Sequence, residues 1–343
     1  MAEKFSKFRD PGTGIQVFLT PVVASPSSST LASVLLPVFA VLGVVRALVG
    51  GVCWALYVLF GWAGFLRGVL FALGFVRLGV EEVSSSSRRR GAASKGELVV
   101  ANHSSWIDLL VLAWVYPGLR FVVPVIEQSA AATPSEAAKK RGAPKANAMS
   151  ANTRIVTPAS TASTAAPAIV GYTLLTLPAA LRFVGNLPPT RALLPSSTRI
   201  LPTLAAALSS SSQALAFFPE LVTSNNRALL HITTLPASAP TTAKCNVMTL
   251  KYSAPTQTSV SAVYTVGQPT HSIAAHLARI LFASSPVRGV SVKRTDVSAL
   301  DSEAWGEHVV AVMSGMARLK QTSIAWWSKR EFLAMVSARS KRA

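Results

Sequence analysis

Residues 102–108 place a histidine and a carboxylate directly after a short apolar run. The string reads Asn102-His103-Ser104-Ser105-Trp106-Ile107-Asp108. Residues five apart in one helix point about 140° apart, so His103 and Asp108 can meet only if His103 lies in a turn before the helix. Ser105, a helix-starting residue type, supplies that boundary. Asp108 would then orient one ring nitrogen of His103 and leave the other to take a proton from a hydroxyl group.

The same residues allow a purely structural interpretation. Ser105 followed three residues later by Asp108 is the pattern of a capping box, in which the carboxylate only satisfies backbone donors at the start of a helix. The residues favour neither interpretation, because capping boxes are common.

Two further strings could help to hold a substrate. Pro219 ends an apolar strand, and Glu220 follows it at the strand's end, where active-site loops often lie. Arg227 comes shortly afterwards in a polar stretch and could bind a phosphate through its planar guanidinium. The turn-like segment Gly185–Arg191 also ends in an arginine. Taken alone, each string is more often an ordinary turn.

The elements around these strings alternate between strand and helix patterns. Expected strands are Leu98–Ala101, Leu119–Val125, Ala214–Phe218, Val247–Tyr252 and Ser259–Val266. Expected helices are Trp106–Val115, Leu201–Leu208 and Ser302–Lys320. The alternation predicts an α/β domain with a mixed sheet flanked by helices. In the last helix, Trp305, Val309, Val312, Met316 and Leu319 share a face that we expect to pack on the sheet.

The N-terminal part of the chain is apolar almost without interruption from Leu31 to Val80. Residues 47–66 carry no charge, and about 20 such residues can span a bilayer. One span or a re-entrant helical hairpin fits equally well, and the alternative is a buried helical pair. Trp54, Tyr57 and Trp62 suit a membrane interface. We therefore predict a membrane-embedded helical region at 29–80.

The charge balance indicates an anionic partner. The chain has 33 Lys and Arg against 14 Asp and Glu, for a formal charge of +19. No zinc-ligand spacing or other nucleic-acid-binding motif accompanies this charge, so we expect membrane lipids and phosphorylated substrates and no nucleic acid. Arg88, Arg89 and Arg90 follow the apolar region and predict a cytosolic face for the domain after them. The two cysteines, Cys53 and Cys245, indicate buried free thiols and no structural metal site.

These patterns predict the following organisation. A polar lead-in at 1–28 precedes the membrane region, and a basic linker follows it at 81–96. The catalytic domain occupies 97–325, with a disordered insertion at 129–167 that is rich in Ala, Ser, Thr and Pro. A tail at 326–343 mixes aromatic and basic residues. We expect it to lie at the membrane interface or to be simply solvated.

Together, the strings resemble the motifs of the glycerolipid acyltransferase superfamily, which includes the lysophosphatidic acid acyltransferases. Residues 102–108 are similar to its first motif, NHxxxxD. Gly185–Arg191 is similar to the second, and Phe218-Pro219-Glu220 to the third, although Leu221 stands where glycine is usual. Residues 225–230 resemble the extended third motif of eukaryotic lysophospholipid acyltransferases, including a fungal type. The resemblance covers about residues 98–252 and preserves the order of the motifs.

The resemblance implies an enzyme that transfers an acyl group from acyl-CoA, as a substrate, without a metal or bound cofactor. His103 would be the base and Asp108 its orienting partner. Glu220, Arg191 and Arg227 would position the acceptor, with Gly185, Asn102 and Pro219 in the motifs around them. The expected reaction makes phosphatidic acid from lysophosphatidic acid during phospholipid biosynthesis. The expected location is the endoplasmic reticulum membrane, with the lipid droplet as an alternative.

Other functions remain open on the sequence alone. Another lysophospholipid or glycerol 3-phosphate would use the same motifs. Leu221 and the basic tail favour a catalytically weak lipid-binding protein on the same scaffold, whereas the intact His103 and Asp108 oppose it.

Overall fold

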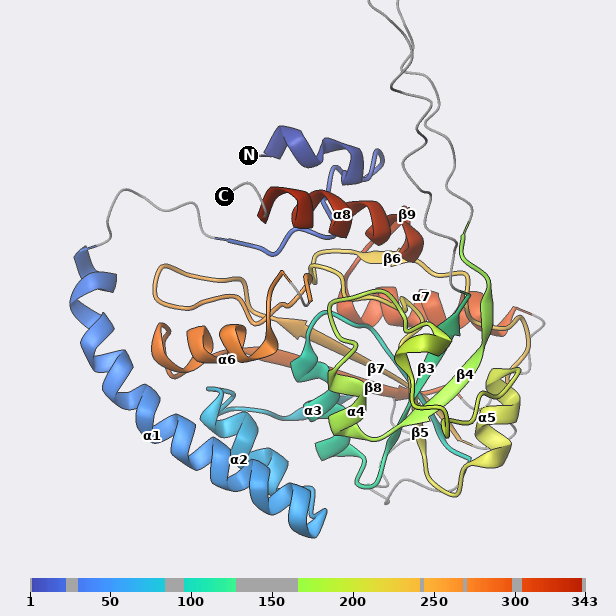
Figure 1. Cartoon of the computed structure of the whole chain (residues 1–343), viewed down its shortest axis with the longest axis horizontal. Coiled ribbons are helices and arrows are strands. Elements are labelled where there is room, and N and C mark those ends of the chain that lie inside the picture. Colours follow the sequence, from blue (N-terminus) through green and yellow to red (C-terminus); the bar gives the residue numbers. More distant parts are fainter. Residues whose placement is uncertain are drawn as a thin grey trace, which may run out of the picture.

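A seven-stranded mixed sheet forms the centre of the molecule in a computed structural model of the chain (Figure 1). The described residues are 2–22, 30–83, 96–127, 166–240, 244–267, 270–297 and 304–340. The strands are β1 (Val80–Glu82), β2 (Leu98–Ala101), β3 (Arg120–Ile126), β4 (Ile169–Leu175), β5 (Leu215–Phe217), β7 (Cys245–Tyr252) and β8 (Val290–Asp296). Their order is β1-β8-β7-β2-β5-β3-β4. The predicted mixed sheet flanked by helices is confirmed.

The middle of the sheet is parallel, and helices cover both of its faces. β7, β2, β5 and β3 run in parallel, whereas β4 and β8 pair antiparallel with β3 and β7. Side chains alternate between two hydrophobic cores, since Val99 and Ala101 of β2 join one core and Leu98 and Val100 the other. α2 (Gly64–Ala72), α3 (Trp106–Val115), α4 (Leu177–Leu181) and α6 (Ile273–Phe282) contribute to the first core. α5 (Leu204–Ser210), α7 (Trp305–Ala317) and α8 (Lys329–Ser340) contribute to the second.

Most of the predicted elements form close to the expected bounds, and the predicted apolar face of α7 packs on the second core. The strand expected at Ser259–Val266 is wrong. Its backbone donors bond elsewhere, because the Val260 N–H bonds to the hydroxyl of Ser284 and the Tyr264 N–H to the carbonyl of Ser104. The alternating pattern here therefore reflects a buried loop beside the turn at 102–105.

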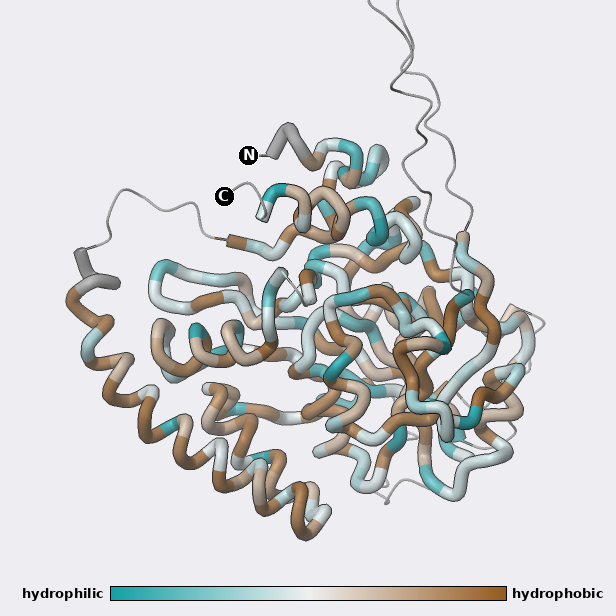
Figure 2. The backbone as a smooth tube through the Cα atoms, viewed as in Figure 1, coloured by the Kyte–Doolittle hydropathy of each residue, from teal (hydrophilic) through white to brown (hydrophobic). Residues whose placement is uncertain are grey.

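The N-terminal region contains one long apolar helix, α1 (Thr30–Phe60), which runs along the edge of the molecule beside α2 (Figures 1 and 2). Its segment Val34–Phe60 is long and apolar enough to cross a membrane. Only 11% of its most apolar 18-residue stretch is buried by the rest of the protein. The uncharged stretch 47–66 is not one helix, because Gly61 adopts φ +69 and ends α1. Because α1 lies at the edge of the molecule, many of its large apolar side chains are exposed.

Arg46 lies in the middle of α1 without interrupting it. Its side chain is 8% exposed, and its guanidinium donates to the carbonyl oxygens of Ala72 at 2.7 Å and Leu281 at 3.0 Å. Ala72 is the last residue of α2, and Leu281 lies in the last turn of α6. Carbonyls at helix ends lack partners within the helix, so one arginine satisfies the ends of two helices and joins α1 to both.

The two ends of the described chain pack together. Phe8 and Phe18 contact Phe332 of α8 at ring-centroid distances of 5.5 Å. Lys329 is also fully buried. β6 (Leu229–His231) and β9 (Gln321–Ala325) form a small parallel sheet that leads into α8. The beginning of the 326–343 segment is thus part of the second core.

Some predictions fall outside the described residues. These are nearly all of the insertion expected at 129–167 and the basic residues Arg88–Arg90 of the expected linker. Cys53 and Cys245 form no disulfide, and Cys245 is buried whereas Cys53 is partly buried.

Candidate active site

His103 lies in the turn between β2 and α3, and Asp108 lies in the first turn of α3, as their five-residue spacing required for the two side chains to meet. β2 ends at Ala101, and α3 begins at Trp106 with Ser105 as its N-cap. The Ser105 hydroxyl accepts a hydrogen bond from the Ile107 N–H at 3.3 Å and donates one to the carbonyl of Ala262 at 2.6 Å. His103 therefore lies at the carboxyl end of a central parallel strand, an edge of the sheet where ligands commonly bind.

His103 and Asp108 are in direct contact. The Nδ1 atom of His103 lies 3.1 Å from Oδ2 of Asp108. The same oxygen accepts hydrogen bonds from the backbone N–H groups of Ser104 at 2.6 Å and Ser105 at 2.8 Å. One carboxylate therefore both caps the start of α3 and contacts the imidazole of His103.

The surroundings of His103 favour its neutral form. Burial lowers the pKa of His103, and the positive charge of Lys329 acts in the same direction, whereas the hydrogen bond and charge of Asp108 oppose them. A carboxylate accepts hydrogen bonds, so Nδ1 carries the ring proton and Nε2 keeps its lone pair. The arrangement thus presents a neutral imidazole that can accept a proton at Nε2.

A cleft opens beside His103. Phe218 stacks on the imidazole with a ring-centroid distance of 4.2 Å and an interplanar angle of 21°. The remaining walls are mostly apolar and come from β3, from the 180–189 segment and from Leu221. Such walls keep water from a reacting centre and suit a substrate with aliphatic parts.

Glu220 lies behind His103 and holds backbone groups. One carboxylate oxygen accepts from the His103 N–H at 2.8 Å and the other from the Leu230 N–H at 2.9 Å. The side chain is 1% exposed. Burial raises the pKa of Glu220 to about 7, although both backbone hydrogen bonds act to lower it. Its described contacts are those of a group that fixes the turn.

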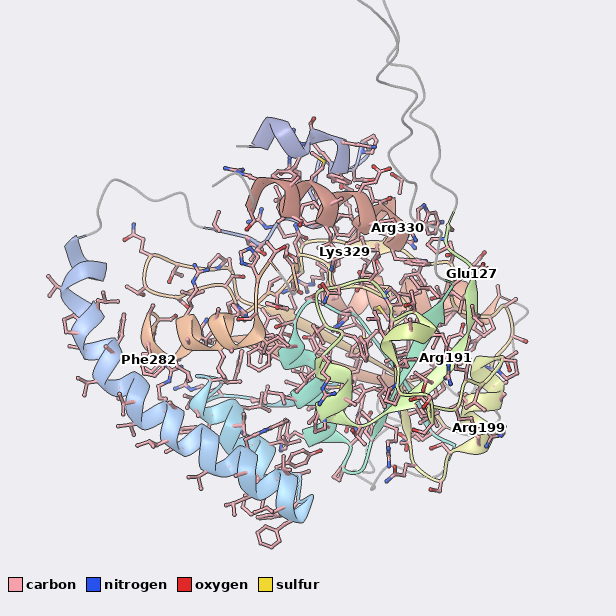
Figure 3. All side chains as sticks on the ribbon, in the orientation of Figure 1. Glu127, Arg191, Arg199, Phe282, Lys329 and Arg330 are labelled. Atoms are coloured by element: carbon pink, nitrogen blue, oxygen red, sulfur yellow. The ribbon has the colours of Figure 1, made fainter. Side chains whose placement is uncertain are left out.

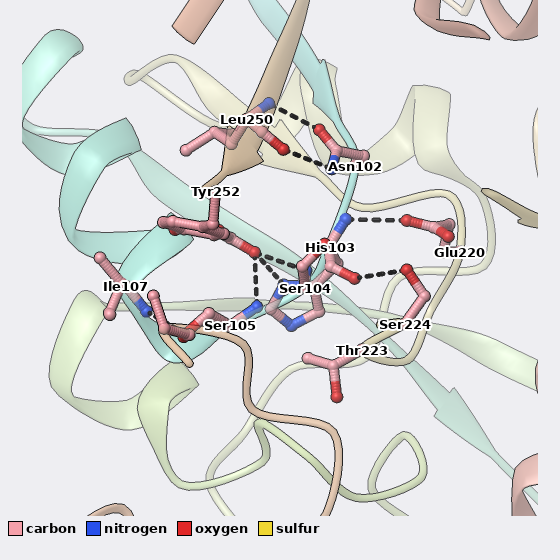
Figure 4. Close-up of polar contacts among 12 residues, drawn as sticks. Asn102, His103, Ser104, Ser105, Ile107, Glu220, Thr223, Ser224, Leu250 and Tyr252 are labelled. Carbon is pink, nitrogen blue, oxygen red and sulfur yellow. Dashed lines mark hydrogen bonds and ion pairs between the residues drawn. The ribbon is translucent and has the colours of Figure 1, made fainter. Parts of the chain in front are cut away.

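Asn102, Pro219 and Leu221 also shape this turn. The Asn102 side chain donates to the carbonyl of Leu250 at 3.0 Å and accepts from its N–H at 2.8 Å, which joins β2 to β7 (Figure 4). Pro219 is buried, and its carbonyl accepts from the Thr234 hydroxyl at 2.7 Å. Leu221 adopts φ 56, the left-handed conformation that glycine takes without strain. This geometry explains why glycine suits the position.

The 185–191 segment reaches the cleft through its middle and not through its arginine. Gly185 has φ +86, and a side chain there would meet the backbone of Gly267 at 2.7 Å. Leu187, Pro188 and Pro189 line the cleft. Arg191 is exposed, and its guanidinium donates to the carbonyls of Thr198 and Ser196 at 2.6 and 2.7 Å (Figure 3).

Arg227 is exposed as well, and neither it nor Arg191 is among the residues that line the cleft. Their assignment to a phosphate group stays a prediction. Among the described residues, no three His, Cys, Asp or Glu side chains gather closely enough to hold a metal ion.

Sequence reasoning missed three residues of this site. Tyr252 donates a hydrogen bond to Oδ1 of Asp108, Phe218 stacks on His103, and Lys329 is buried close enough to affect the charge of His103. Tyr252 ends β7 and Phe218 follows β5, and the apolar patterns of both strands indicate only burial. Lys329 lies beside Arg330 in a segment with several basic residues, where nothing separates a buried lysine from a solvated one.

Comparison with known proteins gives one partial match. A Schizosaccharomyces pombe protein, provisionally named a lysophosphatidic acid:oleoyl-CoA acyltransferase, is 30% identical over 132 residues. The match covers 33% of this chain and 42% of that protein, so the chain spans less than half the length of its relative. No family model and no solved structure matches the chain. The similarity suggests a lysophospholipid acyltransferase.

Proposed function

We propose that this chain is a membrane-associated acyltransferase that transfers a fatty acyl group from acyl-CoA to the hydroxyl of a lysophospholipid. The observation that carries the proposal is the contact of His103 Nδ1 with Asp108, which leaves Nε2 as a base beside an apolar cleft. The partial similarity to the fission yeast protein supports the same class of reaction.

In the proposed reaction, Nε2 of His103 takes the proton of the acceptor hydroxyl as its oxygen attacks the thioester carbonyl. The negative charge of Asp108 stabilises the imidazolium that forms. The new C–O bond replaces the C–S bond, and the departing CoA thiolate receives the proton from His103. Atoms and charge balance without a metal or an acyl-enzyme.

A second, largely apolar cavity supports an acyl substrate. It lies between α1, α2, α3, α4 and α6 and is lined by aromatic and aliphatic residues that include Trp54, Trp106 and Leu277. Trp106 begins the helix that carries Asp108. We assign this cavity to fatty chains because it adjoins the exposed apolar surface of α1.

We assign the membrane contact to α1, whose exposed large apolar side chains include Val41, Leu48 and Leu59. Such a surface on a helix long enough to span a bilayer favours lipid as its surroundings. We propose the endoplasmic reticulum membrane, with the acyltransferase domain on the cytosolic side.

The preferred acceptor is lysophosphatidic acid, because a chain with a formal charge of +19 suits a phosphomonoester. Purified protein in lipid nanodiscs should be incubated with labelled acyl-CoA and a panel of lysophosphatidic acid, other lysophospholipids and glycerol 3-phosphate. His103→Ala serves as the inactive control. No transfer to any acceptor, or equal transfer by the His103→Ala variant, would reject the proposal.

A further inference from the structure

Lys329 is a buried lysine far along the chain from the turn that contains His103. It begins α8 and is 0% exposed, whereas its neighbour Arg330 is only partly buried (Figure 3). Removing an ammonium group from water is costly unless strong acceptors replace the water. The Lys329 ammonium donates to the backbone carbonyl of Thr223 at 2.9 Å and to its hydroxyl at 2.8 Å. Both acceptors are neutral. Burial lowers the pKa of Lys329 well below its ordinary value, and the charge of Glu220 opposes this shift, so the ammonium form is favoured towards acid pH.

Thr223 belongs to a loop that holds the backbone of His103 from two directions. The N–H of Ser224 donates to the His103 carbonyl at 2.9 Å. At the other end of the loop, Glu220 accepts from the His103 N–H at 2.8 Å. The peptide groups on both sides of His103 are therefore fixed by residues 220–224, and the direction of the imidazole depends on this loop.

We propose that Lys329 is a positioning residue for His103: it fixes Thr223, and through Ser224 and Glu220 the loop fixes the base. The inference rests on the proposed function, in which His103 removes the acceptor proton. It makes the start of α8 a part of the active site.

The charge of Lys329 predicts in which direction the pKa of His103 changes when Lys329 is replaced. The ionisable groups facing the imidazole are Asp108 from α3, Glu220 from the loop after β5 and Lys329 from α8, with Tyr252 of β7 bonded to Asp108. A nearby cation disfavours the imidazolium form and so lowers the pKa of His103. Removing the cation should raise that pKa. When the pH is lowered, the variant should therefore lose activity at a higher pH than wild type does. A residue that only packs would leave this transition in place.

The test compares variants of the full chain in nanodiscs. For Lys329→Met we expect kcat to fall about tenfold or more, KM for both substrates to change less than about twofold, and the acid transition of kcat/KM to move to a higher pH. Lys329→Gln keeps a donor but no charge, so it should recover part of kcat and keep the raised transition. Arg330→Gln is the matched control and should behave as wild type. An unchanged acid transition in both Lys329 variants would overturn the proposal.

Two measurements keep the test decisive if Lys329→Met does not fold or the protein proves inactive. Thr223→Val removes one acceptor and keeps the charge, so kcat should fall without a shift of the acid transition; an unchanged kcat rejects the role. The chain has five histidines, so NMR can follow the His103 imidazole, assigned with His103→Gln. An absence of acyl transfer by wild type would reject the proposed function alone, whereas an unshifted His103 titration in Lys329→Gln would reject the role of Lys329.

Discussion

The hydroxyl of Tyr252 donates to Oδ1 of Asp108, while His103 and two backbone N–H groups share Oδ2 of the same carboxylate. Burial and the neighbouring Asp108 raise the pKa of Tyr252 well above its ordinary value, so the hydroxyl keeps its proton and donates. A residue of β7 thus completes the set of partners of a carboxylate on α3. This pairing fixes the carboxylate from the side opposite to the imidazole.

Tyr252→Phe should lower both activity and stability, because it leaves one oxygen of a buried carboxylate without a donor. A hydrogen bond to a charged group contributes about 1.5–3 kcal/mol, so we expect a comparable loss in the free energy of unfolding and a roughly tenfold or larger loss of kcat. Tyr264→Phe is the matched control, since its hydroxyl bonds only to the His271 carbonyl. It should lose stability with little change in kcat. Equal effects of the two variants on kcat would count against a role for Tyr252 in orienting Asp108.

Asp108→Asn should separate orientation of the base from helix capping. The asparagine oxygen can still accept from Ser104 and Ser105, and its amide can donate to the Tyr252 hydroxyl. The charge that stabilises the imidazolium is lost. We expect kcat to fall about 10²- to 10⁴-fold. The free energy of unfolding should change by about 1 kcal/mol, as for other exchanges at helix caps. Urea unfolding beside turnover measurements checks this, and a loss of stability that alone explains the inactivity would support capping as the main role.

The pH dependence should show two ionisations that one variant can separate. His103 must be neutral to act, and its pKa lies below the ordinary 6.5, so kcat/KM should fall as the pH drops through a value below 6.5. Glu220 ionises at about 7, and its carboxylate accepts two backbone N–H groups. Protonation should loosen this hold and produce a smaller decline near pH 7.

Glu220→Gln cannot ionise at position 220. In this variant the decline of kcat/KM near pH 7 should disappear, and the decline below pH 6.5 should remain. The overall rate should be lower, because the glutamine amide group faces a backbone N–H donor. A profile with only the lower transition in wild type would show that the charge of Glu220 does not matter for the reaction.

Leu221→Gly should widen the cleft and cost stability, even though it relieves strain. The left-handed conformation of a leucine costs about 1–2 kcal/mol. Its buried side chain, 9% exposed, contributes about 1.5–3 kcal/mol, and the glycine also adds backbone entropy to the unfolded chain. We therefore expect a net loss of about 1–2 kcal/mol in the free energy of unfolding. A gain in stability would mean that the strain outweighs the burial, and a higher kcat would show that Leu221 obstructs the acceptor.

Arg46→Met should weaken the attachment of α1 to the acyltransferase domain. The variant removes the donors to Ala72 and Leu281 and leaves helix-end carbonyls buried without partners. Each unsatisfied group costs about 1–3 kcal/mol, so the loss should reach at least 2 kcal/mol. Arg77→Met, at an exposed position, is the matched control. Hydrogen exchange should rise at the ends of α2 and α6, and unchanged exchange there would show that α1 is held by apolar contacts alone.

The sequence by itself determined the local geometry of the His103 turn. The five-residue spacing to Asp108, the N-cap at Ser105 and the apolar run of α3 are consequences of backbone geometry, which acts over a few residues. The positions of most strands, the apolar face of α7 and the apolar character of the N-terminal region followed from periodicity and length for the same reason.

Only the tertiary structure decided which distant residues complete the site. Tyr252 and Lys329 reach Asp108 and Thr223 across about 144 and 106 positions of the chain, and such contacts depend on how strands and helices are ordered in space. The same holds for Arg46, a charged residue within the apolar N-terminal region, whose guanidinium satisfies carbonyls of two other helices. The sequence shows that a charged residue lies in an apolar region, where removing it from water costs free energy. The partners that offset this cost come together only when the chain is folded.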